Sequence, residues 1–235
     1  MSGEFLVGTS GFSYPAWRGV FYPEKHPASG MLSFYAGVFG AVEINNTFYR
    51  MPAPALLTGW TQQTPPGFRF ALKAPQQITH RLRLKEAAEP TREFVRRSEA
   101  LGEKRGPLLF QLPPNLKADH ARLETFLAAL PAGLQPAFEF RHGSWFVDET
   151  WSLLRAHGAA LCIAQTDDLD TPLVGTATFG YVRLRRDYEP AALADWAGRL
   201  RAVEGWQRVY VFLKHDEGQA PALARGFVDA LGRNA

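Results

Sequence analysis

Short apolar runs of strand length alternate along the chain with segments whose apolar residues recur at helical spacing. This alternation is typical of βα units that build a parallel sheet. The runs predict eight strands, over residues 5–9, 42–47, 68–73, 108–112, 137–141, 160–165, 181–185 and 208–214. Eight such units predict a TIM-type (β/α)8 barrel, a fold that typically takes about 250 residues. Because the chain has 235 residues and no linker-like tract, we expect a single barrel domain over 1–235.

Helix signals occupy most of the gaps between these strands. Asp119 is a suitable N-cap for a helix whose apolar residues follow the i, i+3, i+4, i+7 spacing, namely Leu123, Phe126, Leu127 and Leu130. Pro190 and Pro221 suit the first turns of two further helices. The residues expected to point inward from these two helices are Leu193, Trp196, Ala197 and Leu200, and Ala224, Phe227, Val228 and Leu231.

Glycines and turn residues predict where helices stop. Gly40 and Gly158 are expected to end helices over 31–39 and 149–157, because glycine readily adopts the left-handed conformation that often follows a helix. Between the sixth and seventh predicted strands, residues 166–172 have turn chemistry and no helical period. We therefore expect one of the eight helices to be missing there.

Strand parity predicts which side chains face the barrel interior. Alternate residues of a barrel strand face the helix layer and the interior, so apolar residues such as Val42, Phe70 and Phe110 leave the polar residues between them inside. The inward polar set is Glu43, Asn45, Arg69, Lys73, Gln111, Glu139, Arg141, Tyr181, Arg183, Arg185, Tyr210 and Lys214. Most of these residues lie in the later half of their strands, where barrels of this type carry their active sites.

The charges of this set indicate an anionic ligand. Apart from Arg69 and Arg185, the set places two acids, Glu43 and Glu139, opposite four bases, Lys73, Arg141, Arg183 and Lys214. An unpaired buried charge is costly, so these groups must neutralise one another or a ligand. We predict an enzyme that acts on a small anionic substrate bearing a phosphate or carboxylate. Glu43 and Glu139 take acid/base roles in it, and Lys73 is the third candidate catalytic residue.

Other chemistries remain open at these positions. Glu43 and Glu139 would suit glycoside cleavage if they lie about 5 to 10 Å apart across the bond. Lys73 or Lys214 would form a Schiff base with a carbonyl substrate if its pKa is lowered. The inward charges would also fit a purely structural network of salt bridges, or a barrel that binds a ligand without turnover.

A divalent metal is a further alternative, with candidate ligands Glu43, Glu139, His142, Asp167 and His215. Carboxylate and imidazole groups suit Zn²⁺ or Mn²⁺. The spacing of these residues is not diagnostic, however, and the inward arginines would repel a cation. The sequence contains no nucleotide-cofactor motif. The cofactor requirement therefore stays open.

Nucleic acid is the alternative partner. The aromatic residues that follow the first predicted strand are expected to pack over the barrel rim, but Tyr14 and Trp17 would also suit stacking of a sugar or base. Between residues 79 and 105, eight Lys or Arg residues accompany five glutamates, which suits either a solvated helix or contacts to phosphates. The net charge of +3 is too small to require a nucleic-acid partner by itself.

The composition, 46% hydrophobic and 21% charged, is that of an ordinary globular domain. No apolar run approaches the roughly 18 residues of a membrane span, and no basic segment with an apolar core opens the chain. We therefore expect a cytoplasmic protein without membrane contact. Cys162 lies in an apolar run and is expected to be a small core residue. The sequence carries no signal for an oligomeric state.

Five segments of the chain resemble the YecE-like proteins, catalogued as domain of unknown function family 72. They are GTSGFSY at 8–14 with Trp17, VEINNTFY at 42–49 with Pro52, FALKAP at 70–75 with ITH at 78–80, LFQLPP at 109–114, and FEFRH at 138–142 with Trp145. The resemblance spans nearly the whole chain. It implies a β/α barrel and no established activity.

The resemblance also implies a set of recurrent polar positions. These fall on Glu43, Asn45, Lys73, His80, Gln111, Glu139, Arg141 and His142. Asn45, His80, Gln111 and His142 thereby join the other candidate substrate-binding residues, which are Tyr14, Trp17, Arg141, Arg183 and Lys214.

The chain departs from the family pattern at two strands. Where the family commonly has Arg-x-His-Gly after the seventh strand, residues 183–186 read RLRR. Where the family often ends the eighth strand with asparagine, this chain has Lys214 followed by His215. We expect the ligand chemistry on this side of the mouth to differ accordingly.

Overall fold

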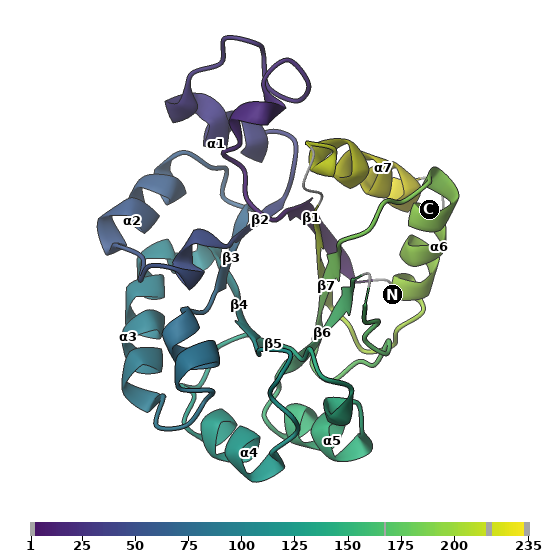
Figure 1. Ribbon diagram of the computed structural model, residues 1–235. Helices are drawn as coiled ribbons and strands as arrows, with labels where there is room; N and C mark the ends of the chain where they lie inside the picture. Colours follow the sequence, from purple (N-terminus) through teal and green to yellow (C-terminus); the bar gives the residue numbers. More distant parts are fainter. Residues whose placement is uncertain (1–2, 167, 215–217, 233–235) are drawn as a thin grey trace.

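Eight parallel strands curve into one nearly closed barrel with helices around its outside (Figure 1). The computed structural model describes residues 3–166, 168–214 and 218–232. The strands are β1 (Glu4–Thr9), β2 (Ala41–Ile44), β3 (Arg69–Lys73), β4 (Arg105–Gln111), β5 (Pro136–Glu139), β6 (Ala160–Gln165), β7 (Phe179–Leu184) and β8 (Arg208–Leu213). Their spatial order is β1-β8-β7-β6-β5-β4-β3-β2, so strands that follow one another in sequence lie side by side. The predicted TIM-type barrel of eight parallel strands is confirmed.

Several strand ends differ from the prediction. β2 ends at Ile44 instead of at 47, because Asn46–Phe48 form a short 3-10 helix, η3. β5 ends at Glu139, so Arg141 follows the strand. β4 begins earlier than expected, at Arg105, and so does β7, at Phe179. These shifts leave the inward and outward parity of each strand unchanged.

The described helices cover the outside of the barrel. The α-helices are α1 (Met31–Ala36), α2 (Pro54–Gln62), α3 (Ala88–Ser98), α4 (His120–Ala128), α5 (Asp148–Ala156), α6 (Pro190–Arg201) and α7 (Ala220–Gly232). Besides η3, the short 3-10 helices are η1 (Pro15–Trp17), η2 (Ala28–Gly30), η5 (Glu99–Lys104) and η6 (Gly143–Trp145). A π-helical turn, η4 (Gln77–Arg81), follows β3. Single π-helical turns are often found at functional sites.

The helix boundaries largely follow the local signals in the sequence. The Asp119 side chain caps α4 by accepting a hydrogen bond of 3.0 Å from the backbone N–H of Arg122. Pro190 is the first residue of α6, and Pro221 lies in the first turn of α7. Gly158, with φ of 59°, follows α5 as predicted.

Two helix predictions were wrong. α1 ends at Ala36, where the Gly37 N–H bonds to carbonyls of the last turn, so Gly40 does not terminate this helix. Val228 is 42% exposed. The buried stripe of α7 is centred on Phe227 and takes in Ala230, which leaves Val228 on the solvent side.

The predicted absence of a helix between β6 and β7 is confirmed for the described residues of that connection, 166 and 168–178. Side chains from this connection and from nearby segments cover part of the barrel surface that the missing helix would otherwise cover. The Thr176 hydroxyl accepts a bond of 2.7 Å from the Leu161 N–H and donates one of 2.8 Å to the Ala159 carbonyl. The Trp206 indole packs on Gly180 of β7, where an added Cβ would lie 2.9 Å from the ring.

The buried apolar side chains separate into two clusters, as strand parity predicts. The cluster between barrel and helices includes Val42, Phe70, Leu72, Phe110 and Phe138. The cluster inside the barrel includes Ala71, Leu109, Cys162, Tyr210 and Phe212. Cys162 is fully buried and unpaired, which confirms its expected place in the core.

The barrel closes between β1 and β2 at what we call the β1–β2 seam, formed by residues 8–11 and 41–43. Its direct backbone links among the described residues are a bridge between Ser10 and Glu43 and a bond of 2.8 Å from the Gly11 N–H to the Glu43 carbonyl. Gly8 permits the close approach of the two strands, because a Cβ there would lie 1.8 Å from the Ala41 carbonyl oxygen.

Tyr35 of α1 completes the seam with its side chain. Its hydroxyl accepts a hydrogen bond of 2.7 Å from the Thr9 N–H and donates one of 3.0 Å to the Ala41 carbonyl. The ring is fully buried. A phenolic hydroxyl therefore bridges two strands at a point where a strand ladder would otherwise join them.

Candidate active site at the barrel mouth

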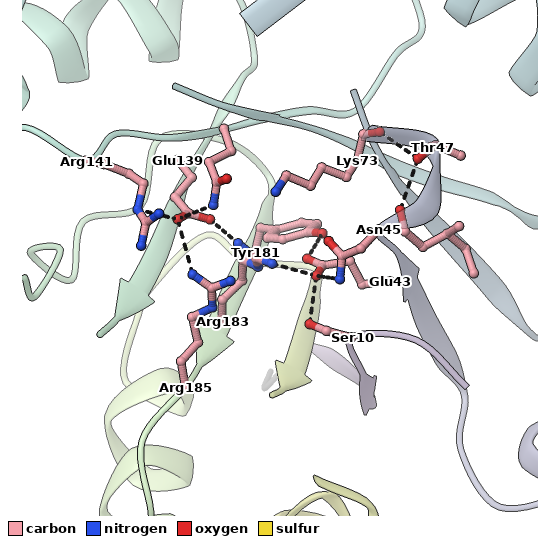
Figure 2. Close-up of polar contacts among 12 residues, drawn as sticks. Ser10, Glu43, Asn45, Thr47, Lys73, Glu139, Arg141, Tyr181, Arg183 and Arg185 are labelled. Carbon is pink, nitrogen blue, oxygen red and sulfur yellow. Dashed lines mark hydrogen bonds and ion pairs between the residues drawn. The ribbon is translucent and has the colours of Figure 1, made fainter. Parts of the chain in front are cut away.

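One buried guanidinium joins two carboxylates at the C-terminal ends of the strands. Arg183 of β7 donates from Nη2 to Glu43 Oε1 of β2 at 2.8 Å, and from Nη1 to Glu139 Oε2 of β5. All three side chains are at most 1% exposed. Figure 2 shows the guanidinium lying between the two acids. They meet because each residue has the inward parity in the last two positions of its strand.

Other side chains also donate hydrogen bonds to the two carboxylates. Ser10 Oγ and Asn45 Nδ2 donate to Glu43 Oε1 at 2.7 and 3.2 Å. The Tyr181 hydroxyl donates to Glu43 Oε2 at 2.7 Å. On the other side, Gln111 Nε2 donates to Glu139 Oε1 at 2.7 Å. Each buried acid is thus held in a fixed orientation by several donors.

Two further arginines approach Glu139 without a hydrogen bond. Arg141 Nε lies 3.5 Å and Arg185 Nη1 lies 3.9 Å from Glu139 Oε1. Neither guanidinium makes a hydrogen bond to any described residue, and Arg185 Nε is buried without a partner. Arg141 is 33% exposed and Arg185 is 16% exposed. Both arginines therefore have unused donors in a partly dry environment at the mouth.

The arginines keep both acids ionised. Burial alone would raise the pKa of Glu139, but the charges of Arg183, Arg185 and Arg141 lower it to about 2. Burial also acts to raise the pKa of Glu43, and the charge of Arg183 with the hydrogen bonds from neighbouring side chains lowers it overall. The two acids and Arg183 thus form a fixed ion triad and not a pair of carboxyl groups sharing a proton.

Lys73, the last residue of β3, brings an amine to the same layer. Its Nζ lies 4.1 Å from the centroid of the Phe48 ring, and no described residue offers it a hydrogen bond or an ion pair within 4.0 Å. Burial, followed by the charge of Arg183, lowers its pKa to about 8. Figure 2 shows the amine pointing toward the space between the Glu139 and Glu43 sides of the site.

His80 in the π-helical turn η4 lies beside this amine. Its ring meets the Phe48 ring edge-on with centroids 4.9 Å apart, so His80 and Lys73 contact the same aromatic ring. Burial and then the charge of Lys73 lower the pKa of His80. The imidazole is therefore predominantly neutral at pH 7.

The sequence-predicted residues divide into three groups. The first group lies in or beside the network just described and consists of Glu43, Glu139, Lys73, Arg141, Arg183, Asn45, Gln111 and His80. Tyr14, Trp17 and Lys214 line a separate cavity of about 290 Å³, which borders the network at Ser10. His142 does not join either group through the described contacts. Its Nδ1 instead accepts the Ser144 N–H at 3.1 Å and caps η6.

The aromatic residues after β1 pack over the barrel rim, as expected. Trp17 is 3% exposed, and its ring packs against Phe21 and Tyr22. Tyr14 stacks obliquely on Trp17 and donates from its hydroxyl to the Ser10 carbonyl at 2.7 Å. Stacking of a ligand on these rings stays a prediction.

Sequence reasoning missed three members of the site. Tyr181 and Arg185 have the inward parity, but the candidate list omitted them because nothing in their local sequence shows which partner they reach. Ser10 lies in the turn after β1, where Gly11 has a φ of 96°, and its side chain bonds to Glu43. Its position directly after an inward-facing strand end was the available signal.

No cluster of ligand side chains among the described residues supports the predicted metal site. In the described part of the chain, no three His, Cys, Asp or Glu side chains gather as metal ligands. Glu43 and Glu139 are separated by the Arg183 guanidinium, which occupies the place where a bridging cation would sit. Asp167 and His215 lie outside the described residues, so their proposed role as ligands stays a prediction.

The charged stretch that prompted the nucleic-acid alternative includes the mixed-charge helix α3 and the segments on both sides of it. Glu89 pairs with Arg92 at 2.6 Å, and Glu93 pairs with Arg96 and Arg97 at 2.8 and 2.6 Å. All three arginines of α3 are thus paired with glutamates of the same helix, and nucleic-acid binding stays a prediction. Among the described helices, none has the length and apolar character to cross a membrane.

The family assignment agrees with this geometry. The sequence profile described as "Protein of unknown function DUF72" matches residues 6–235. This chain belongs to the DUF72 family. A DUF72 protein of Thermotoga maritima has a solved structure that superimposes with a TM-score of 0.87 at 30% identity, over 97% of this chain and 99% of that one. A DUF72 protein of Enterococcus faecalis shares the fold with a TM-score of 0.80 at 19% identity, over 97% and 95% of the two chains.

Two curated relatives of this DUF72 chain carry the designation UPF0759 in their names. UPF0759 protein YecE of Escherichia coli K12 is 30% identical over 141 residues, which is 60% of this chain and 49% of YecE. UPF0759 protein YunF of Bacillus subtilis is 26% identical over 199 residues, which is 80% of this chain and 68% of YunF. The matched region thus spans about half the length of YecE.

Proposed function

We propose that this DUF72 protein is an enzyme that acts by acid/base chemistry on a small anionic substrate at the C-terminal mouth of the barrel. The observation that carries the proposal is the surplus of positive charge there. Among the described residues, Arg141, Arg183, Arg185 and Lys73 surround only two carboxylates. A substrate carboxylate or phosphate would neutralise that surplus.

Arg141 and Arg185 are the proposed anion-binding residues. Their guanidinium groups have unused donors and only long contacts to Glu139, at 3.5 and 3.9 Å. A planar guanidinium fork suits bidentate binding of carboxylate or phosphate oxygens. Because Arg185 Nε is buried and unpartnered, an incoming anion would satisfy a donor that is otherwise left unbonded.

The proposed proton-transfer groups differ from those that the sequence favoured. A carboxyl group whose pKa is about 2, as at Glu139, is a weak general base and is not protonated to act as a general acid at neutral pH. Lys73, with a pKa of about 8, and the neutral His80 exchange protons much more readily near pH 7. In this proposal Glu43 and Glu139 orient Arg183, and glycoside cleavage by the acid pair is disfavoured.

Thermal denaturation with a panel of anions tests the proposal. We expect inorganic phosphate, small carboxylates or sugar phosphates to raise the melting temperature, because a ligand at 100 times its Kd stabilises by about 2.7 kcal/mol. Arg185→Ala and Arg141→Ala should lose the rise. Arg92→Ala, on the exposed face of α3, is the matched control and should keep it.

Other outcomes separate the alternatives. If no anion shifts wild-type melting, the cluster is a structural network and the anion site is refuted. Saturable binding with no turnover of any bound compound would identify a ligand-binding barrel instead of an enzyme. Binding of an oligonucleotide that weakens steeply with salt, and that survives both arginine substitutions, would place the partner elsewhere on the surface.

A further inference from the structure

We infer that the Lys73 amine forms an imine with the substrate, so that the ligand of the barrel mouth is a small aldehyde or ketone bearing a carboxylate or phosphate. This inference rests on the proposed anion-binding function and deepens it by naming the reactive group and the substrate class. It starts from a buried amine that forms no ion pair within 4.0 Å with any described residue.

Both interior carboxylates are satisfied without Lys73. Glu43 accepts hydrogen bonds from four side chains, and Glu139 accepts from Gln111 and Arg183. Lys73 Nζ instead lies against the Phe48 ring, at 4.1 Å from its centroid. A lysine that neutralises a buried acid is a structural ion-pair partner. An amine left outside such a pair, at the end of a barrel strand, is placed as a nucleophile would be.

The surroundings favour the neutral form of this amine. Lys73 is 8% exposed, and burial with the charge of Arg183 lowers its pKa to about 8. At pH 7 roughly a tenth of the amine is therefore unprotonated, far more than for an ordinary lysine. Only this form has the lone pair that attacks a carbonyl carbon.

The reaction balances with groups at the site and water. The neutral Nζ adds to the carbonyl carbon, and a proton moves from nitrogen to the carbonyl oxygen to give a carbinolamine. The C–O bond then breaks, the hydroxyl group takes up one proton and leaves as water, and nitrogen forms the C=N bond of the iminium ion. His80 contacts the same Phe48 ring as Lys73 and is placed to relay these protons as a neutral imidazole.

The anionic group of the substrate has its own place beside the amine. Arg141 and Arg185 follow β5 and β7 at the mouth into which Lys73 projects (Figure 2). Their unused donors hold the carboxylate or phosphate, and its negative charge offsets the charge that the iminium ion retains. A carbonyl compound without an anionic group lacks this anchor.

Reductive trapping tests the inference on the intact chain. Wild-type protein is incubated with glyoxylate, pyruvate or dihydroxyacetone phosphate and sodium cyanoborohydride, and adducts are measured by intact mass and peptide mapping. We expect one saturable adduct on Lys73 with at least one of these probes, suppressed by inorganic phosphate and weak with acetaldehyde. Lys73→Met should lose this adduct, and Lys117→Met, at an exposed position, should keep it.

Parallel anion binding separates this inference from the proposed function. If phosphate raises the melting temperature of the wild type but no probe labels Lys73, the imine is refuted while the anion site stands. If neither occurs, both fail. Labelling of Lys214, or labelling spread over exposed lysines and equal with acetaldehyde, also refutes the inference. Because wild-type mapping decides the matter, the test does not depend on the folding of a variant.

Discussion

At the scale of single residues, Arg183 holds together parts of the barrel that lie far apart in the sequence. Its guanidinium joins Glu43 on β2 to Glu139 on β5, on opposite sides of the barrel (Figure 1). Burial acts to lower the pKa of Arg183, but the two acids raise it well above its ordinary value. The triad is therefore a permanent charge assembly that fixes the geometry around which Lys73 and the outer arginines are arranged.

Removing one of the two acids should show how strongly the stability of the protein depends on an intact ion triad. We expect Glu139→Gln to lower the free energy of unfolding by about 3 to 5 kcal/mol, because it leaves buried arginine charge without compensation. Urea denaturation measures the change. Glu89→Gln removes an exposed partner of Arg92, 80% accessible, and should cost less than about 1 kcal/mol. A similar small cost at both positions would contradict a tightly held triad.

Lys73 should destabilise the unliganded protein at neutral pH. Its pKa is about 8 in the folded chain and 10.5 when unperturbed, so below pH 8 both states are protonated and the folded state carries a penalty of about 3 kcal/mol. Between these values the folded state alone loses the proton, and stability rises with pH. Lys73→Met should therefore be more stable than the wild type at pH 7, by an amount that shrinks toward pH 10.5.

Urea denaturation of both proteins at the two pH values checks this expectation. The mouth also contains Arg183, Arg185, Glu139, Glu43 and His80, which remain in both proteins. The charge of Lys73 acts on the pKa of His80, but burial lowers that pKa as well, so the imidazole is predominantly neutral in both proteins from pH 7 upward. A variant less stable than the wild type at pH 7 would show that the amine is favourably bonded in solution.

At the scale of elements, strand parity was predictable and strand ends were not. Phe70 and Leu72 alternate with Ala71 and Lys73, so the sequence itself separates the helix-facing side of β3 from the interior. The end of β2 depends on whether the next residues pair or turn, and no local apolar pattern decides that. The predicted buried face of α7 was wrong at Val228 for a similar reason. The packing of α7 on the barrel decides which of its several apolar residues are buried.

The partners within the site were the least predictable part. Strand parity places Glu43, Arg183 and Glu139 in one layer of the barrel interior, but it does not determine which acid forms an ion pair with which basic side chain. Tyr181 and Ser10 reach Glu43 across distances that only the closed barrel defines. The resemblance of the sequence to a family pointed to His142 as well, and the structure uses that side chain to cap η6.

The link between α1 and the sheet can be tested at the same scale. Tyr35→Phe removes the hydroxyl that accepts from the Thr9 N–H and donates to the Ala41 carbonyl. Two buried backbone groups then lose a partner, so we expect a loss of about 1 to 3 kcal/mol in the free energy of unfolding. Tyr49→Phe, at a 75% exposed ring, is the control and should be neutral. An unchanged Tyr35→Phe would mean that other groups satisfy this backbone.

At the scale of the whole molecule, the barrel is unevenly secured around its circumference. Paired residues run the full length of β1 and β8 and of β7 and β8, whereas in the described part of the chain the β1–β2 seam has a single bridge, between Ser10 and Glu43. The free energy of local opening is lower where fewer backbone pairs hold a segment in place. We expect the Gly11 amide, which donates across the seam to the Glu43 carbonyl, to exchange hydrogen with solvent faster than the amides of β8, as measured by mass spectrometry or NMR. Equal protection would contradict a weak seam.

A barrel has no free sheet edges only while it stays closed. Once Tyr35 withdraws from the seam, β1 and β2 become the two edges of an open sheet, and β2 has neither proline nor lysine, its charged residue being the inward-facing Glu43. Edges of this kind are templates for strands of neighbouring molecules. The resistance of this protein to aggregation therefore depends on the Tyr35 side chain of α1, which takes no part in the proposed chemistry at the mouth.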